Sequence, residues 1–199
     1  MTHTLVGSST FCIFQEKLLS AVLEIKKLGK IRYFVSPQVL VQLYYTLISP
    51  FLTYSLITWG NTNPTSLQPL ITLQKKAVRI ITFSDVNSHS SPLFRKLGLL
   101  KLGDLIYLDN ALFMHDYYSY RRSSTCNNFF KSINKVHQYA TRPASKKSYY
   151  FPKVSTNYGT FNIRFSGAKL WNAIKEDLKS ASRSVRFKEL LKESVISKY

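Results

Sequence analysis

The sequence has very little negative charge. Only 10 of its 199 residues are Asp or Glu, against 28 Lys and Arg, which gives a formal net charge of +18. No acidic residue occurs from Tyr117 to Lys175, so this window lacks counter-charges of its own. A polyanion that releases condensed counterions on binding is the natural partner of such a segment. We expect nucleic acid as the partner, with anionic lipid as the second choice and a merely soluble basic surface as the alternative.

Cysteine is also scarce, since Cys12 and Cys126 are the only two. Two cysteines cannot assemble a disulfide framework or a four-ligand zinc cluster. Cys126 and His137 would need ligands from elsewhere to hold a metal, so we predict no metal site and no cofactor in this chain. The N-terminus lacks the basic start and sustained apolar run of a secretory signal. We expect an intracellular protein that is not secreted, with nucleus and cytoplasm both open.

Charge is absent throughout the stretch 33–74. A bilayer core about 30 Å thick requires roughly 20 apolar residues, so this stretch is long enough to serve as an anchor. A membrane-associated basic protein is therefore the alternative function. Pro50 near the middle, and the polar residues around it, favour a buried helix pair instead, with Ser36 as a cap and Pro37 in the first turn. We do not expect this stretch to span a membrane.

Apolar residues at helical spacing predict a mainly α protein. The expected helices are 15–33, 64–83 with Asn63 as its cap, 93–97 stopped by Gly98, 104–118, 167–178, and a last one from about Ser184. Between them, residues 121–159 are rich in polar residues and are expected to form loops with short extended pieces. Residues 157–160 are expected to turn, and Phe161–Phe165 alternates as a half-buried strand would, although a helix could absorb the same residues.

Three of these helices have predicted buried faces. The predicted core positions of helix 64–83 are Leu67, Leu70, Ile71, Ala77, Val78 and Ile81. Those of helix 104–118 are Leu105, Leu108, Leu112 and Phe113, and those of the helix from Ser184 are Phe187, Leu190, Leu191 and Val195. Lys75, Lys76 and Arg79 lie outside the apolar face of helix 64–83, with Lys75 and Arg79 one turn apart. A solvated helix face is the alternative reading of these three cations.

Three blocks of sequence stand out together. The first runs from Leu28-Gly29-Lys30-Ile31-Arg32-Tyr33 through residues 43–54 to Trp59-Gly60. The second is Leu73-Gln74-Lys75-Lys76-Ala77-Val78-Arg79-Ile80-Ile81, followed by His89 and Pro92-Leu93-Phe94. The third runs from Tyr158-Gly159 to Gly167-Ala168-Lys169-Leu170-Trp171-Asn172. In order and spacing they resemble the region that follows the polymerase palm in jockey-like non-LTR (LINE-type) retrotransposon reverse transcriptases.

The resemblance covers about residues 25–199 and implies a domain organisation. Residues 1–24 are unmatched, as in a truncated or rearranged copy with a foreign start. Residues 25–120 would form a helical thumb-like domain, 121–158 a basic loop-rich linker with short strands, and 159–199 a C-terminal module built on a helical pair. The parent enzyme is an RNA-directed DNA polymerase, so the resemblance implies RNA and DNA template-primer, and the missing palm, as partners.

Catalysis is not expected of this chain alone. Polymerase chemistry requires paired carboxylates that hold two divalent metals about 3.5–4 Å apart. The family carries them in an upstream Tyr-x-Asp-Asp turn, where the parent enzyme would use Mg²⁺. The nearest string here, Tyr107-Leu108-Asp109-Asn110, lacks the second carboxylate and lies within a helical pattern instead of a hairpin turn. We assign no catalytic residue.

The sequence therefore predicts a fragment that binds nucleic acid. The expected phosphate contacts are Lys75, Lys76, Arg79, Arg121, Arg122, Lys146 and Lys147. Tyr149, Tyr150 and Tyr158 are candidates for stacking on unpaired bases, each contributing roughly 1–3 kcal/mol. Ordinary core packing is the alternative role for these aromatic residues.

Overall fold

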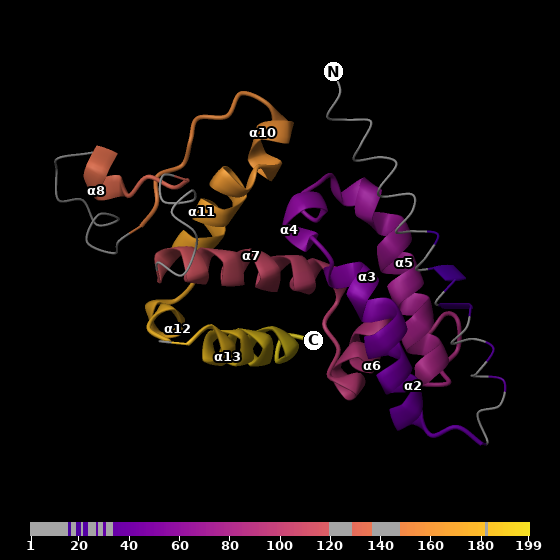
Figure 1. The fold of residues 1–199 in the computed structure, drawn as a ribbon. Helices are drawn as coiled ribbons and strands as arrows, with labels where there is room; N and C mark the ends of the chain where they lie inside the picture. The colour runs from indigo at the N-terminus through magenta and orange to yellow at the C-terminus, as the bar shows by residue number, and fades with distance from the viewer. Residues whose placement is uncertain are drawn as a thin grey trace. The chain divides into compact units, whose positions relative to one another are not determined.

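The computed structural model is mainly helical, as predicted (Figure 1). It describes residues 34–119, 129–136, 148–181 and 183–199, together with Glu16, Leu19, Ser20, Val22, Leu23, Lys27 and Lys30. The chain divides into two compact units. The first is Met1–Leu105 with Val195–Tyr199, and the second is Ile106–Ser194. The boundary falls inside a helix, before the predicted domain end at residue 120.

The first unit is built from consecutive short helices around one long helix. Its elements are α2 (Pro37–Leu43), the π-helical turn η1 (Tyr44–Ile48), α3 (Ser49–Thr53), α4 (Leu56–Trp59), α5 (Pro64–Ile81), α6 (Ser90–Leu97) and the start of α7 (Leu102–Tyr118). The described positions between Glu16 and Lys30 are helical as well. α5 contacts both α2 and α6, so it is the central helix of this unit (Figure 1).

The uncharged stretch forms the core of the first unit. Between Leu40 and Leu56 its buried residues recur every fourth position: Leu40, Tyr44, Ile48, Leu52 and Leu56. Pro50 has no N–H to donate to the preceding turn, and the helix widens to a π-helical turn just before it, where the Ser49 amide bonds the Tyr44 carbonyl. The helical run continues through Pro50 and ends at Thr53. Over the described residues, the structure contains no helix with the length and apolar character to cross a membrane.

The long helix α5 begins where the sequence predicts. Pro64 occupies its first turn, and the Asn63 side chain accepts a hydrogen bond of 3.2 Å from the Thr65 amide. This bond satisfies one of the amides that every helix start leaves without an intrahelical partner. The Asn63 cap is therefore a local reason why α5 starts at this residue.

Removing this cap is expected to weaken the first unit measurably. Asn63→Ala should lower the free energy of unfolding by about 1 kcal/mol, because the Thr65 amide loses its acceptor. Asn87→Ala, at an exposed loop position, is the matched control and should leave stability almost unchanged. Urea unfolding followed by circular dichroism measures both. Equal midpoints for the two variants would show that the cap does not stabilise the helix.

The helices after α5 also end for identifiable reasons. Gly98 ends α6 in the left-handed conformation with φ +63°, as a terminating glycine does. α6 starts at Ser90, three residues before the predicted helix 93–97. α7 carries Asp104 in its first turn, where the helix dipole favours a carboxylate. The Tyr199 hydroxyl donates to Asp104 Oδ2, and burial raises the pKa of Tyr199 above its usual range.

The second unit contains the rest of α7 and the shorter C-terminal helices. These are α8 (Ile133–Val136), α10 (Asn157–Phe161), α11 (Ile163–Ala173), α12 (Glu176–Lys179) and most of α13 (Ser184–Ile196). Extended pairing in the described residues is limited to one antiparallel bridge between Ser132 and Tyr149. α13 starts at Ser184 as predicted and buries Phe187, Leu191 and Val195.

At Phe161–Phe165 the strand interpretation is wrong and the helical alternative is correct, and the turn expected at 157–160 is part of a short helix. Asn157–Phe161 is the short helix α10, capped by Thr156, whose side chain accepts from the Gly159 amide. Asn162 then caps α11, because its side chain accepts a 2.9 Å hydrogen bond from the Arg164 amide. Two caps in quick succession produce two helices with one residue between them, which the apolar-polar alternation does not reveal.

The buried face of α7 differs from the predicted stripe. Leu108 is buried as expected, but the other buried residues of α7 in the second unit are Asn110, Ala111, Met114 and His115. Leu105, Leu112 and Phe113 are only half-buried. Gly167 explains part of this difference, because a Cβ added there would lie 3.0 Å from Met114 Sδ. The glycine lets α11 approach α7 closely and rotates the buried face toward Met114.

Candidate nucleic-acid interface

Three predicted phosphate contacts share one side of α5. Lys76 is exposed, whereas Lys75 and Arg79 are half-buried. Spacings of three and four residues bring these side chains together on one face of a helix. The buried residues of the helix, Leu67, Leu70, Leu73, Gln74, Ala77, Val78 and Ile81, occupy its other side. The predicted amphipathic division of α5 is confirmed, apart from Ile71, which is half-buried.

Arg79 is held by its neighbourhood. Its Nε donates a 3.1 Å hydrogen bond to the Ser88 carbonyl. Arg79 also lies in the last turn of α5, where a cation offsets the negative end of the helix dipole. The two Nη atoms form the outer end of the guanidinium, and a guanidinium fixed at Nε loses little further freedom on binding an anion. Arg79 thus has a structural role and a geometry compatible with a phosphate contact.

The position of α5 is set by Gln74, a buried polar residue that is 1% exposed. Its Nε2 donates to the Tyr44 hydroxyl and to the Leu100 carbonyl, each at 2.9 Å, and its Oε1 accepts from the Leu102 amide at 2.9 Å. One side chain thereby joins α5 to η1 and to the segment before α7. Burial raises the pKa of Tyr44 to about 12, so its hydroxyl is neutral at physiological pH.

Sequence reasoning overlooked the role of Gln74. A signal for it exists, because Gln74 lies four residues after Leu70 and four before Val78, both of which were predicted to be buried. A glutamine on the apolar face of a helix requires hydrogen-bond partners inside the core. The adjoining lysines lie on the outer face of α5, whereas the side chain with the most hydrogen bonds to other elements lies on its inner face.

The three stacking candidates have different environments. Tyr149 is 9% exposed and packs against the rings of Tyr117 and Phe130 at centroid distances of 5.8 and 5.5 Å. Asn172 holds its backbone from both sides, accepting from the Tyr149 amide at 3.0 Å and donating to its carbonyl at 2.9 Å. Core packing therefore accounts for Tyr149. Tyr150 is half-buried, and Tyr158 in α10 is 81% exposed.

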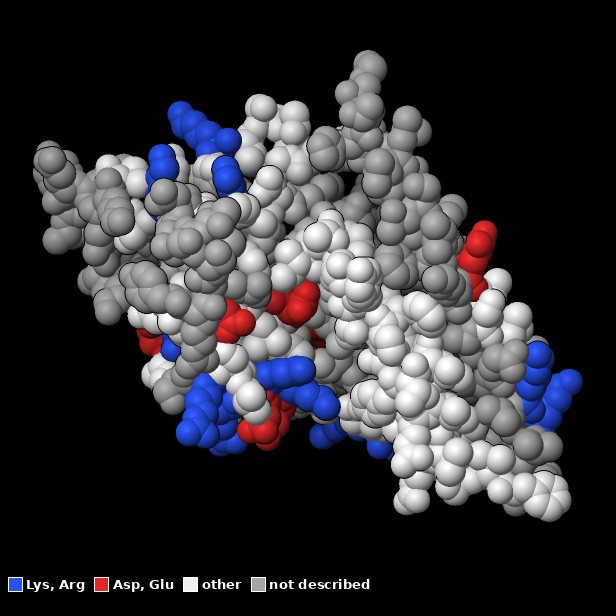
Figure 2. All heavy atoms as spheres, in the orientation of Figure 1, with Lys and Arg blue, Asp and Glu red and all other residues white. Residues whose placement is uncertain are grey.

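Four further candidates, Arg121, Arg122, Lys146 and Lys147, lie outside the described residues. On the face seen in Figure 2, the described Lys and Arg side chains form several separate groups, and Asp and Glu side chains lie near some of them. Within the described ranges, no three His, Cys, Asp or Glu side chains come together in a way that could hold a metal ion. The string Tyr107-Leu108-Asp109-Asn110 lies within helix α7, as predicted.

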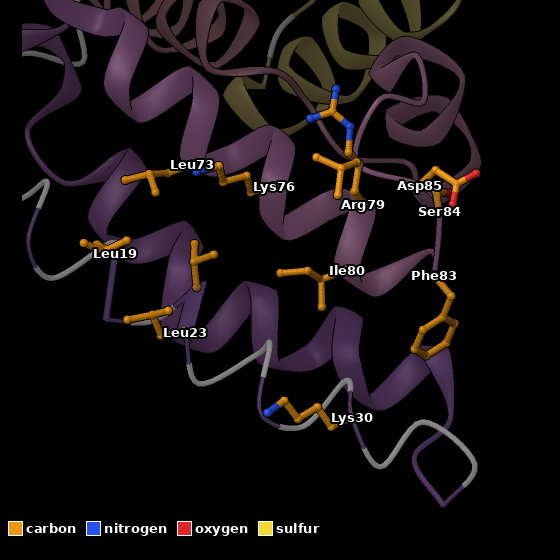
Figure 3. A pocket seen from close by; sticks show the side chains of 12 residues that line it. Leu19, Leu23, Lys30, Leu73, Lys76, Arg79, Ile80, Phe83, Ser84 and Asp85 are labelled. Carbon is orange, nitrogen blue, oxygen red and sulfur yellow. The ribbon is translucent and has the colours of Figure 1, made fainter.

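A groove adjoins the basic side of α5. Its volume is about 620 Å³, and its described lining includes Lys76 and Arg79 but not Lys75. Figure 3 shows Leu73 and Ile80 of α5 on one side and Leu19 and Leu23 on the other. The lining residues in full are Leu19, Val22, Leu23, Lys30, Leu73, Lys76, Arg79, Ile80, Phe83, Ser84, Asp85 and Val86.

Comparisons of this chain with protein families, with curated proteins and with solved structures find no match.

Proposed function

We infer that this chain is a nucleic-acid-binding module, similar to the thumb and C-terminal region of a non-LTR retrotransposon reverse transcriptase. It binds template-primer through phosphates, with Lys75, Lys76 and Arg79 on α5 as the principal contacts. The observation that carries the proposal is the charge: +18 overall, with an acid-free window from Tyr117 to Lys175. The placement of three cations on one side of α5 is consistent with it.

On this proposal, polymerase chemistry belongs to a palm and to its Mg²⁺ ions, and this chain contributes binding. Non-specific binding to nucleic acid comes essentially from phosphate neutralisation, which requires clustered cations and no particular sequence readout. Tyr158, the most exposed of the stacking candidates, is available for contact with an unpaired base. Catalysis by the isolated chain is not part of the proposal.

Charge reversal on α5 is expected to weaken this binding strongly. The variant with Lys75, Lys76 and Arg79 all changed to Glu should bind a labelled RNA–DNA hybrid at least about tenfold more weakly, because three phosphate contacts become repulsive. Fluorescence anisotropy at fixed salt measures the affinity.

The matched control reverses three other exposed cations, Arg183, Lys188 and Lys198. Both variants carry net charge +12, since three reversals remove six units from +18. The control should lose much less affinity. Equal losses would show that only total charge matters and that α5 is not the interface.

A further inference from the structure

The groove beside α5 has a strongly apolar lining that is open to solvent. Leu19, Leu23, Phe83 and Val86 all line it and are 45%, 47%, 38% and 79% exposed. Large apolar side chains that gather at the surface of a protein mark a site of interaction. Phe83 reaches this surface through the turn that ends α5, in which its φ is +54°, its amide bonds the Ile80 carbonyl and the Ser84 amide bonds the Arg79 carbonyl.

The shape of the groove suits an elongated occupant. The described helical positions Leu19, Leu23 and Lys30 line one side of the groove, and Leu73, Lys76 and Ile80 of α5 line the other (Figure 3). At 1.5 Å per residue the α5 wall, from Leu73 to Ile80, is about 10 Å long, which corresponds to about two helical turns. Side chains three and four residues apart on two such walls offer the ridges between which a third helix packs.

The charges at the edge of the groove select the occupant. Lys30, Lys76 and Arg79 are among its described lining residues, and Asp85 is the one acid among them. In Figure 3, Lys30 lies at one edge and the Arg79 guanidinium is turned toward the opposite edge. A helix with leucine-type residues on one face and carboxylates flanking that face would bury the apolar walls and pair with these cations.

A second copy of this chain does not meet these requirements. With 28 basic and 10 acidic residues, any helix it supplied would come with a body of net charge +18. Like charges repel across an interface and oppose association. A nucleic acid meets the charge requirement but offers no aliphatic surface to cover Leu19, Leu23 and Val86. The occupant favoured by both charge and lining is an acidic amphipathic helix of another protein.

We propose that the groove lined by Leu19, Val22, Leu23 and Lys30 on one side and by α5 on the other docks an acidic amphipathic helix of a partner protein. This interaction is separate from nucleic-acid binding and does not depend on it. It shares Lys76 and Arg79 with the proposed nucleic-acid contacts, whereas Lys75 belongs to the nucleic-acid side alone. Partner and nucleic acid therefore compete for this face of α5.

A designed peptide tests the proposal directly. The probe is a fluorescein-labelled 18-residue helix with leucines at positions i, i+3, i+4 and i+7 and glutamates on its other faces. Anisotropy should show it binding the full chain at least tenfold more tightly than two controls: a scrambled peptide without an apolar face, and the same helix with lysines for glutamates. Equal binding of all three peptides, or no binding, would overturn the proposal.

Uncharged substitutions separate this site from the nucleic-acid site. Leu23→Gln and Val86→Gln change exposed positions and leave the charge intact, and each should weaken peptide binding at least fivefold with little effect on hybrid binding. Val185→Gln is the matched control, since Val185 is 69% exposed but lies outside the groove. Lys75→Glu should give the reverse result, weaker hybrid binding with the peptide affinity nearly unchanged.

Nucleic acid and a second copy of the chain are the two other possible occupants of the groove. Each predicts a different experimental result, and either result would overturn the proposal. If Leu23→Gln weakens hybrid binding as much as peptide binding, the groove holds nucleic acid. If the chain self-associates in sedimentation equilibrium and Val86→Gln abolishes the association, a second copy occupies it. If the chain binds the acidic peptide but not the RNA–DNA hybrid, the proposed nucleic-acid-binding function is wrong and the docking site is still supported.

Discussion

Replacing Gln74 with leucine is expected to lower the free energy of unfolding by about 3 kcal/mol, because it removes partners from three buried groups at once. The Leu100 carbonyl, the Leu102 amide and the Tyr44 hydroxyl all bond this one side chain. Leucine has a similar size, so the loss reports unsatisfied polar groups and not an empty cavity. Urea unfolding followed by circular dichroism measures the effect.

Gln68→Leu is the matched control for this substitution. Gln68 lies on the same helix α5 but is exposed, so the same change there should shift stability by no more than about 0.5 kcal/mol. If both variants unfold at the same urea concentration, the buried hydrogen bonds of Gln74 do not hold the first unit together. The position of α5 would then need another explanation.

Replacing Trp171 with alanine is expected to destabilise the second unit by about 3–5 kcal/mol, the usual cost of emptying a buried aromatic site. Trp171 is 1% exposed and lies among the rings of Tyr118, His115 and Phe187 at centroid distances of 5.3, 6.3 and 6.2 Å. The Lys179 ammonium lies 5.5 Å from the centroid of the Trp171 ring and makes a cation–π contact with it.

The Trp171→Ala substitution should also disturb the surroundings of His115. This histidine is completely buried, stacks on Phe187 at 4.4 Å, and contacts the Ala181 carbonyl through Nε2 at 2.8 Å. A carbonyl can only accept, so Nε2 carries the proton of this hydrogen bond. Emptying the neighbouring site would admit water to Nδ1, which the folded structure leaves without a hydrogen bond.

Trp59→Ala provides the comparison, since Trp59 is the other tryptophan and is only half-buried. Its loss should cost about half as much or less, because less apolar area leaves water. Thermal unfolding monitored by circular dichroism measures both variants. Equal effects would contradict the view that Trp171 anchors the second unit.

Local capping chemistry made much of the first unit predictable. Asn63 followed by Pro64 identifies the start of α5, and Gly98 identifies the end of α6, because both act through their own backbone neighbourhood. The apolar recurrence in the uncharged stretch likewise indicates a buried helix, whose geometry becomes π-helical just before Pro50. In each case the residues that decide the structure lie within one or two turns of each other.

The errors arise where distant contacts decide the outcome. The face of α7 depends on Gly167, which lies far along the chain and permits the close approach of α11. The alternation in Phe161–Phe165 is typical of a strand, but the Asn162 cap selects a helix. The candidate site shows the same division: the outer face of α5 follows from periodicity, whereas the three hydrogen bonds of Gln74 require the folded structure.

The salt dependence of binding tests the central proposal most directly. Each phosphate contact contributes about −0.9 to the slope of log K against log salt concentration for duplex DNA. The variant with Lys75, Lys76 and Arg79 changed to Glu should therefore flatten the slope for an RNA–DNA hybrid by about 2–3, through lost counterion release. A slope identical to that of the unmodified chain would show that α5 does not contact the phosphates.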